Sequence, residues 1–220
     1  MRGRFISFEG GEGAGKSTHT RLLAERLTEL GVAVVRTREP GGSPGAEVIR
    51  QVLLSGAAKR LGTRAEALLF AAAREDHVRH TIAPALAQGS WVICDRFFDS
   101  TRVYQGAVGK LDLRYIHALE RITVGALKPD LTFIMDVPVE VGMSRAGRRR
   151  KGEEPDRFEA ESRAFHEQLG QAYRLLAQSE PERCVLIDAT QPKGLVGDRI
   201  WQIVGERLHP ERLAAAGAAR

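Results

Sequence analysis

The stretch Gly10-Gly11-Glu12-Gly13-Ala14-Gly15-Lys16-Ser17-Thr18 decides the fold of this chain. It fits the pattern G-x-x-x-x-G-K-[ST], in which a glycine-rich turn joins a strand to a helix. The apolar run Phe5–Phe8 precedes it, and a helical pattern over residues 20–27 follows. Glycines let backbone N–H groups converge on phosphate oxygens, and the helix N-terminus adds partial positive charge. The stretch therefore predicts that residues 10–18 bind a nucleoside triphosphate.

Two side chains of this loop have separate predicted tasks. Lys16 can reach the β- and γ-phosphates of ATP, and the Ser17 hydroxyl can hold Mg²⁺. A second oxygen ligand is predicted at Asp95, which ends the buried run Val92–Cys94, because P-loop enzymes hold Mg²⁺ with an aspartate at the end of a neighbouring strand. A structural ion pair between Asp95 and Arg96 is the alternative.

Composition is typical of one globular domain. The chain has 220 residues, of which 43% are hydrophobic and 28% charged, enough to bury one core. No apolar run approaches the roughly 20 residues of a membrane helix. Residues 1–4 lead straight into the first predicted strand, so we expect no signal peptide and a cytoplasmic location. Cys94 and Cys184 lie in apolar runs and are predicted to be buried, reduced thiols.

The net charge of +5 is consistent with two kinds of ligand. Nucleic acid, bound on a basic surface, is one, and small polyanionic substrates are the other. The densest basic cluster, residues 145–151, contains no aromatic side chain. Charge alone does not choose between them.

Short apolar runs alternate with amphipathic ones along the whole chain, which predicts an α/β fold with a five-stranded parallel sheet and helices on both faces. The expected strands are Arg4–Glu9, Ala33–Thr37, Trp91–Asp95, Leu131–Asp136 and Cys184–Ile187. The expected helices are Thr18–Leu30, Gly45–Ser55, Arg64–Gln88, Leu113–Leu127, Glu159–Glu180 and Gly194–Leu208. Residues 1–208 form one predicted domain, and residues 209–220 a frayed tail. Ligands are expected beyond the carboxyl ends of the strands.

The segment Asp95-Arg96-Phe97-Phe98-Asp99-Ser100-Thr101-Arg102-Val103-Tyr104-Gln105 resembles the motif D-R-[FYH]-x-x-S-[ST]-x-[AV]-Y-Q of bacterial thymidylate kinases. Further segments agree in order and spacing: 8–18, 37–42, 69–74, 128–132, 156–159 and 187–192. The resemblance covers residues 4 to about 208. It implies a P-loop kinase that transfers the γ-phosphate of ATP to dTMP, giving dTDP and ADP for dTTP synthesis. It also implies Mg²⁺ as cofactor, a homodimer, and no nucleic-acid or membrane partner.

The base and sugar of dTMP have four implied contacts. Phe70 and Arg74 are four residues apart on an expected helix and so share a face, where the ring can stack on thymine and the guanidinium can donate to a ring carbonyl. From the residues alone, Phe70 could equally be core and Arg74 a surface residue. The resemblance further implies that Tyr104 packs under the deoxyribose, leaving no room for a 2′-OH, and that Gln105 contacts the thymine edge.

The phosphate of dTMP has its own implied contacts. Arg96 resembles the arginine that grips the acceptor phosphate, a role suited to its planar fork, and Ser100 belongs to the same motif. Arg38 and Arg50 are weaker candidates for this phosphate. Glu9, a carboxylate at a buried strand end, is expected to help hold either Mg²⁺ or the acceptor.

The resemblance also implies a mobile lid over residues 145–156, because of the composition of the phosphate-binding loop 10–18. Some thymidylate kinases carry an arginine inside it, but positions 11–14 here are Gly, Glu, Gly and Ala. In relatives with that pattern a lid supplies the cation for the transition state. The candidates are Arg148, Arg149 and Arg150, which would act beside Lys16 and Arg96. Segment 147–155 contains no apolar side chain, so we expect it to be mobile.

Two other functions remain open. One is a kinase of the same fold that acts on another nucleoside monophosphate. The other is a P-loop nucleic-acid-binding ATPase, which the charge of +5 would suit. The chain lacks the N-K-x-D motif that guanine-binding switches carry.

Overall fold

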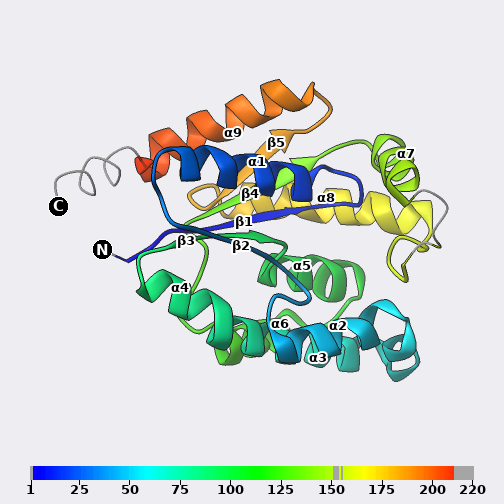
Figure 1. The fold of residues 1–220 in the computed structure, drawn as a ribbon. Helices are drawn as coiled ribbons and strands as arrows, with labels where there is room; N and C mark the ends of the chain where they lie inside the picture. Colours follow the sequence, from blue (N-terminus) through cyan, green and yellow to red (C-terminus); the bar gives the residue numbers. More distant parts are fainter. Residues whose placement is uncertain (1, 151–153, 155, 211–220) are drawn as a thin grey trace.

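A parallel five-stranded sheet forms the centre of the molecule (Figure 1). The computed structural model describes residues 2–150, 154 and 156–210. The strands lie in the order β2-β3-β1-β4-β5, and each pair of neighbours is parallel. Every strand begins and ends within one residue of its predicted bounds: β1 Phe5–Gly10, β2 Val34–Arg38, β3 Trp91–Asp95, β4 Leu131–Asp136 and β5 Cys184–Asp188.

Helices cover both faces of this sheet, with α1 and α9 on one side and α2 to α6 on the other (Figure 1). Within the described residues no helix is long and apolar enough to cross a membrane. The helices are α1 Lys16–Glu29, α2 Pro44–Leu54, the 3₁₀ turn η1 Ala57–Leu61, α3 Gly62–His77, the π-helix η2 Val78–Ile82, α4 Ala83–Ala87, α5 Phe98–Thr101, the π-helix η3 Arg102–Val108, α6 Leu113–Thr123, α7 Val139–Arg150, α8 Arg163–Ser179 and α9 Lys193–Leu208.

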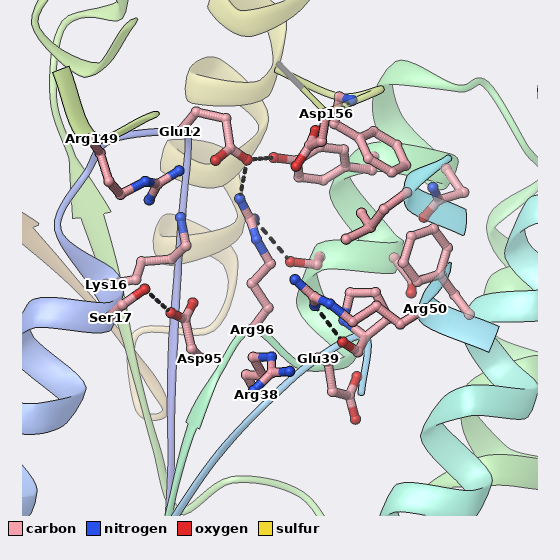
Figure 2. Close-up of a pocket in the computed structure, with 18 residues that line it drawn as sticks. Glu12, Lys16, Ser17, Arg38, Glu39, Arg50, Asp95, Arg96, Arg149 and Asp156 are labelled. Carbon is pink, nitrogen blue, oxygen red and sulfur yellow. Dashed lines mark hydrogen bonds and ion pairs between the residues drawn. The ribbon is translucent and has the colours of Figure 1, made fainter. Parts of the chain in front are cut away.

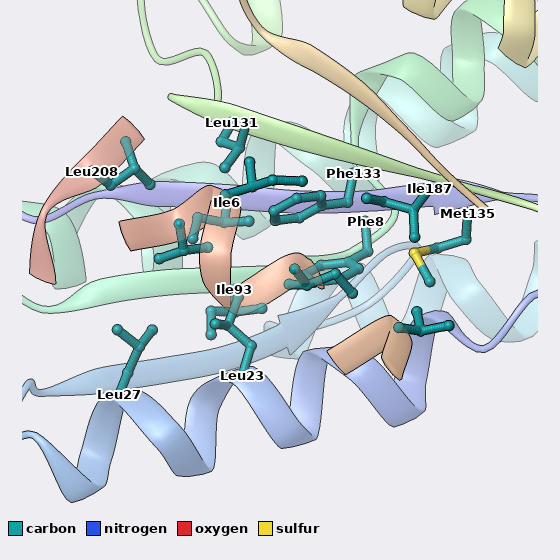
Figure 3. Packing of buried hydrophobic residues seen from close by; sticks show 14 of the residues in the cluster. Ile6, Phe8, Leu23, Leu27, Ile93, Leu131, Phe133, Met135, Ile187 and Leu208 are labelled. Atoms are coloured by element: carbon teal, nitrogen blue, oxygen red, sulfur yellow. The ribbon is translucent and has the colours of Figure 1, made fainter. Parts of the chain in front are cut away.

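The strands read as continuous apolar runs because side chains on both faces are buried. Ile6 and Phe8 of β1 face α1 and α9, and the Phe8 ring lies 5.2 Å from that of Phe133 (Figure 3). Phe5 points to the opposite face and packs in the cluster that includes residues of α4. Cys94 and Cys184 are free and buried, as the sequence predicts.

Three helical segments differ from the predictions. The expected helix Arg64–Gln88 is broken by the π-turn η2, because the ring of Pro84 removes a hydrogen bond and crowds the carbonyl four residues earlier. Helices α5 with η3, and α7, were not predicted. Residues 147–150 finish α7, although the sequence suggests an irregular segment there. Residues 151–153 and 155 of that segment lie outside the described residues, as do residues 211–220 of the frayed tail predicted at 209–220.

The loop after β1 lies directly on α7. Gly13 has φ +65°, and a Cβ built there would lie 1.9 Å from the Gly142 oxygen. A Cβ on Gly142 would in turn lie 2.4 Å from the backbone oxygen of Glu12. Backbone contact this close excludes a side chain at either position. The glycine pair therefore fixes α7 against the loop.

Candidate active site

The loop of residues 10–18, hereafter the phosphate cradle, joins β1 to α1, and Lys16 begins the helix. Its Nζ donates to the carbonyl oxygens of Gly10, at 3.1 Å, and Gly11, at 2.7 Å. Burial, together with the charge of Arg96, lowers the pKa of Lys16 to about 8. The N-terminus of α1 and the Lys16 ammonium group therefore both place positive charge at the cradle.

A cavity of about 460 Å³, hereafter the donor cavity, lies over the cradle. Its walls combine the cradle with α7 and with the segment that leads into α9. The residues outside the cradle that line it are His19, Arg145, Arg149, Ala189, Gln191, Lys193 and Val196. Basic side chains therefore surround the space above the cradle, as a polyphosphate requires.

Ser17 and Asp95 meet at the edge of this space. The Ser17 hydroxyl donates to Asp95 Oδ2 at 2.5 Å (Figure 2). Hydroxyl and carboxylate oxygens are ligands that Mg²⁺ prefers. No group of three or more His, Cys, Asp or Glu residues in the described ranges could hold a metal by itself. The pair thus fits an ion that takes its remaining ligands from water and substrate phosphates, the usual arrangement for Mg²⁺.

A second cavity of about 200 Å³, hereafter the acceptor pocket, lies beside the cradle (Figure 2). Its walls come from the loops after β1, β2 and β3, from helices α1, α2, α3 and α5, from η3, and from α7 with the segment after it. The lining residues are Glu12, Lys16, Ser17, Arg38, Glu39, Pro40, Arg50, Leu54, Phe70, Asp95, Arg96, Ser100, Thr101, Tyr104, Gln105, Arg149, Asp156 and Phe158. Most of the residues predicted for dTMP binding are brought together here.

Arg96 connects the pocket to the cradle. It follows β3 with φ +69°, a conformation that is strained for a residue with a Cβ and that often marks functional sites. Its Nη1 donates to the Gly10 oxygen at 3.0 Å and to Ser100 Oγ at 3.3 Å. Its Nη2 donates to Glu12 Oε1 at 2.5 Å. The guanidinium is therefore held in the acceptor pocket by contacts to the first residues of the cradle.

Glu12 belongs to the cradle by sequence, yet its carboxylate faces the acceptor pocket. Burial disfavours its charge, but Arg96 and Lys16 outweigh burial and lower the pKa of Glu12 to about 2. The Tyr104 hydroxyl also donates to it, at 3.4 Å. The sequence predicts Glu12 as part of the ATP-binding loop. It does not predict that the Glu12 side chain lines the acceptor pocket as well.

Aromatic rings form one wall of the acceptor pocket. Phe70 of α3 and Tyr104 of η3 both approach Phe158, with ring centroids 5.9 and 5.6 Å away. The Tyr104 ring also lies under the Arg96 guanidinium, at 5.2 Å. Phe158 was noted in the sequence only as part of a matching segment. The wall offers apolar faces on which a planar base can stack.

Arg74 lies behind this pocket and not on its surface. Its side chain is 4% exposed, and its Nε donates to Glu39 Oε2 at 2.8 Å. It also donates to Thr101 Oγ1 and to the Phe97 oxygen. Phe70 and Arg74 share one helix, as predicted, but only Phe70 lines the pocket. Gln105, although buried, does line it.

Glu9 is fully buried beneath Ser100. One carboxylate oxygen accepts from the Phe97 backbone, at 2.8 Å, and the other accepts from Ser100 Oγ, at 2.7 Å, and from Tyr173 Oη, at 3.0 Å. Burial, reinforced by Asp99, raises the pKa of Glu9 to about 7. Glu9 lines neither cavity, whereas Ser17 lines both and Asp95 lines the acceptor pocket.

The two weaker phosphate candidates do line the pocket. Arg38 pairs with Glu47 at 2.9 Å, and Arg50 donates to the Pro40 oxygen at 2.5 Å. Burial and the nearby Arg38 lower the pKa of Arg50. Both guanidinium groups belong to residues that line the pocket, so both can contact an anion bound there.

The three lid arginines occupy different surroundings. Arg148 donates to Ser144 along α7 and is exposed, whereas Arg149 and Arg150 pair with Glu159 at 2.6 and 2.9 Å. Arg149 is the one of the three that lines the two cavities. In Figure 2 its side chain points toward the space above Lys16.

Comparisons with known proteins point to one family. The family model for thymidylate kinase matches residues 8–200. A thymidylate kinase of Bradyrhizobium sp. strain ORS 278 is 60% identical over 215 residues, covering 98% of this chain and 95% of that protein. One from Rhodopseudomonas palustris is 59% identical over 220 residues, covering 99% and 96%.

A solved structure agrees as well. The crystal structure of thymidylate kinase from Ehrlichia chaffeensis has a TM-score of 0.73 and 34% identity, and the match covers 93% of this chain and 99% of that chain. The predicted family, fold and enzyme class are confirmed. The chain belongs to the thymidylate kinase family.

Proposed function

We propose that the donor cavity holds the phosphates of ATP and the acceptor pocket holds dTMP, so that phosphorylation of dTMP to dTDP takes place where the cavities meet. The observation that carries this proposal is that Lys16, Ser17 and Arg149 line both cavities. A phosphoryl group at the junction can therefore be contacted from the donor side and from the acceptor side by the same three side chains.

Positioning and charge neutralisation are the main tasks of this site, because phosphoryl transfer needs little covalent help from the protein. The phosphate of dTMP contacts Arg96, with Arg38 and Arg50 nearby in the pocket. One of its oxygens forms the new bond to the γ-phosphorus, and the bond to the bridging oxygen of ADP breaks. The attacking oxygen is already anionic, so no general base is required.

Mg²⁺ would be held by Ser17 and Asp95, whose oxygens lie 2.5 Å apart. When bound it neutralises charge on the β- and γ-phosphates. Glu9 is left out of this set because its two oxygens already accept hydrogen bonds from Phe97, Ser100 and Tyr173. It supports the acceptor side by fixing Ser100.

Arg149 is the lid arginine that supplies the catalytic cation. It lines both cavities, whereas Arg148 lies along the exposed side of α7. Arg149 and Arg150 both pair with Glu159, but Arg150 lines neither cavity. Thymine stacks on Phe70, and Gln105 lies at the base end of the pocket. Tyr104 lies under the sugar. Arg74 acts at the base end from behind the wall. Three of its five N–H groups donate to Glu39, Thr101 and Phe97, and the other two are not used in these bonds.

The substrate assignment is tested by an ADP-release assay with ATP and Mg²⁺ across dTMP, dUMP, dCMP and dGMP. We expect dTMP to have the highest kcat/KM. A higher value for dCMP or dGMP would contradict the assignment of the base end. Binding to duplex DNA that weakens steeply with salt would favour the nucleic-acid reading of the charge instead.

A homodimer fits an apolar surface on packed helices α2, α3 and α6. Val48, Leu68 and Ile122 are 65%, 49% and 77% exposed there, and α3 packs against both other helices. Burying such side chains against a second copy would stabilise the assembly. Sedimentation velocity measures this directly. The cytoplasmic location predicted from the sequence stays a prediction.

A further inference from the structure

His77 is a fully buried histidine whose two ring nitrogens both have partners. It ends α3 and is 0% exposed. Its Nδ1 lies 3.0 Å from Glu39 Oε1, and its Nε2 lies 2.7 Å from Thr37 Oγ1. Thr37 belongs to β2 and Glu39 to the loop that follows. The imidazole therefore bridges the end of β2 and the start of a loop that lines the acceptor pocket.

One neutral tautomer satisfies this arrangement. The Nδ1–H donates to the Glu39 carboxylate, and the Thr37 hydroxyl donates to Nε2. The other oxygen of Glu39 accepts from Arg74 Nε at 2.8 Å. Glu39 and Arg74 are 5% and 4% exposed, so they form a buried ion pair, and loss of one partner leaves the other without its hydrogen bond. Thr37, His77, Glu39 and Arg74 thus form one buried chain of contacts.

The far end of this chain reaches a second wall of the pocket. Arg74 donates to Thr101 Oγ1 at 3.1 Å and to the Phe97 oxygen at 3.2 Å. Its guanidinium lies 5.5 Å from the centre of the Phe97 ring. Glu39 and Thr101 both line the acceptor pocket. Arg74 therefore ties the loop after β2 to the segment after β3.

The loop also leaves the imidazole no room to move. Gly42 has φ +86°, and a Cβ there would lie 2.4 Å from both His77 Nε2 and Thr37 Oγ1. The backbone at Gly42 thus passes directly over the ring. A ring confined in this way can set the position of the carboxylate it contacts.

We propose that His77 is a positioning residue for the acceptor pocket, acting through Glu39 to fix Arg74 at the base end. This rests on the proposed role of Arg74 toward thymine. Without the Nδ1–H, one Glu39 oxygen loses its donor, and a buried carboxylate that lacks a partner moves or takes a new one. Arg74 then loses its fixed place between the two walls, although His77 never touches the substrate.

Two substitutions separate this role from simple packing. In His77→Asn the amide N–H can replace Nδ1–H and keep the bond to Glu39. In His77→Gln the longer side chain reaches the Nε2 position and keeps the contact with Thr37 only. We expect His77→Gln to raise the KM for dTMP about tenfold, the effect of one lost buried hydrogen bond to a charged group. His77→Asn should stay within about threefold, since that bond remains.

The KM for ATP should stay unchanged in both variants, and His77→Gln should also lower the preference for dTMP over dCMP. His80→Gln is the matched control, since it makes the same change three residues later on a side chain that is 52% exposed. Equal KM increases for dTMP in the Asn and Gln variants, or a parallel rise in the KM for ATP, would overturn the proposal.

Arg74→Lys distinguishes failure of this inference from failure of the site assignment. If Arg74→Lys leaves the KM for dTMP and the preference over dCMP unchanged, the role of Arg74 is wrong. If it changes both while folded His77→Gln does not, only the role of His77 is wrong. Should His77→Gln not fold, Glu39→Gln tests the same hydrogen bond from its other side. It must raise the KM for dTMP at constant KM for ATP, and an effect on thermal stability alone overturns the inference.

Discussion

The phosphate cradle and the acceptor pocket are built in opposite ways, although three residues of the cradle, Glu12, Lys16 and Ser17, also line the pocket. The cradle is nine consecutive residues, 10–18, whose backbone and one lysine provide the binding groups. The pocket assembles side chains from positions 12 to 158, brought together by the order of the strands. A site made by one turn depends on local conformation, whereas a site made by many segments depends on how they pack.

This difference predicts how each site responds to mutation. In the cradle, one residue carries one task, so a single change should remove donor function outright. In the pocket, Arg96, Glu12 and Tyr104 contact one another, and partners in such a network share their effects. Substitutions there should shift selectivity and affinity in graded amounts.

The largest effect is expected at Lys16. Lys16→Ala removes the cradle's ammonium group and should lower kcat by roughly a thousandfold or more, the scale of losing a cation at a transferring phosphoryl group. Steady-state ADP release measures it, and circular dichroism checks that the variant is folded. Near-normal turnover in a folded Lys16→Ala protein would show that the cradle does not bind the transferred phosphoryl group.

Arg149 tests the junction between the two sites. Arg149→Ala should lower kcat up to about a thousandfold, by analogy with arginine fingers, and raise the KM for dTMP much less, because its charge is needed only during transfer. Arg148→Ala is the matched control on the exposed side of α7 and should retain wild-type kcat. If the two variants behave alike, the catalytic cation lies elsewhere, which the triple variant with Arg150→Ala would show.

The smallest effect is expected in the pocket, at Tyr104. Tyr104→Leu opens space under the sugar and should narrow the preference for dTMP over its ribonucleotide counterpart by roughly tenfold, the size of a single steric contact. Tyr104→Phe keeps the ring and loses only the hydroxyl near Glu12, so its ratio should equal that of the wild type. An unchanged ratio in Tyr104→Leu argues that another residue excludes the 2′-OH.

Much of the fold could be predicted because its signals are local. Strand bounds follow from apolar runs such as Trp91–Asp95, and the cradle follows from its glycines and Lys16. Helix α7 could not be predicted in the same way, since Gly142 and Gly147 disfavour a helix. Its stability comes from packing on the cradle, where Gly142 and Ala146 are buried.

Most residues of the predicted site line the two cavities, but their arrangement could not be predicted. Spacing places Phe70 and Arg74 on one helix face, and both belong to α3, but only Phe70 lines the pocket. That Arg74 is buried depends on Glu39 and Thr101, which come from two other segments. The side chain of Glu12 turns to the acceptor pocket because it pairs there with Arg96, a residue whose backbone has a positive φ. Such facts belong to tertiary contacts that no single motif contains.

The glycine contact between the cradle and α7 makes this helix a lever. Gly142 is the pivot, and Arg149 lies seven residues further along the same helix, a distance of about 10 Å at 1.5 Å per residue. A rotation of about 5° at the pivot would then displace Arg149 by about 1 Å, and misplacement on that scale can cost a hundredfold in rate. The close contact of two backbones at Gly13 and Gly142 therefore sets the position of Arg149, the proposed catalytic cation, about 10 Å away.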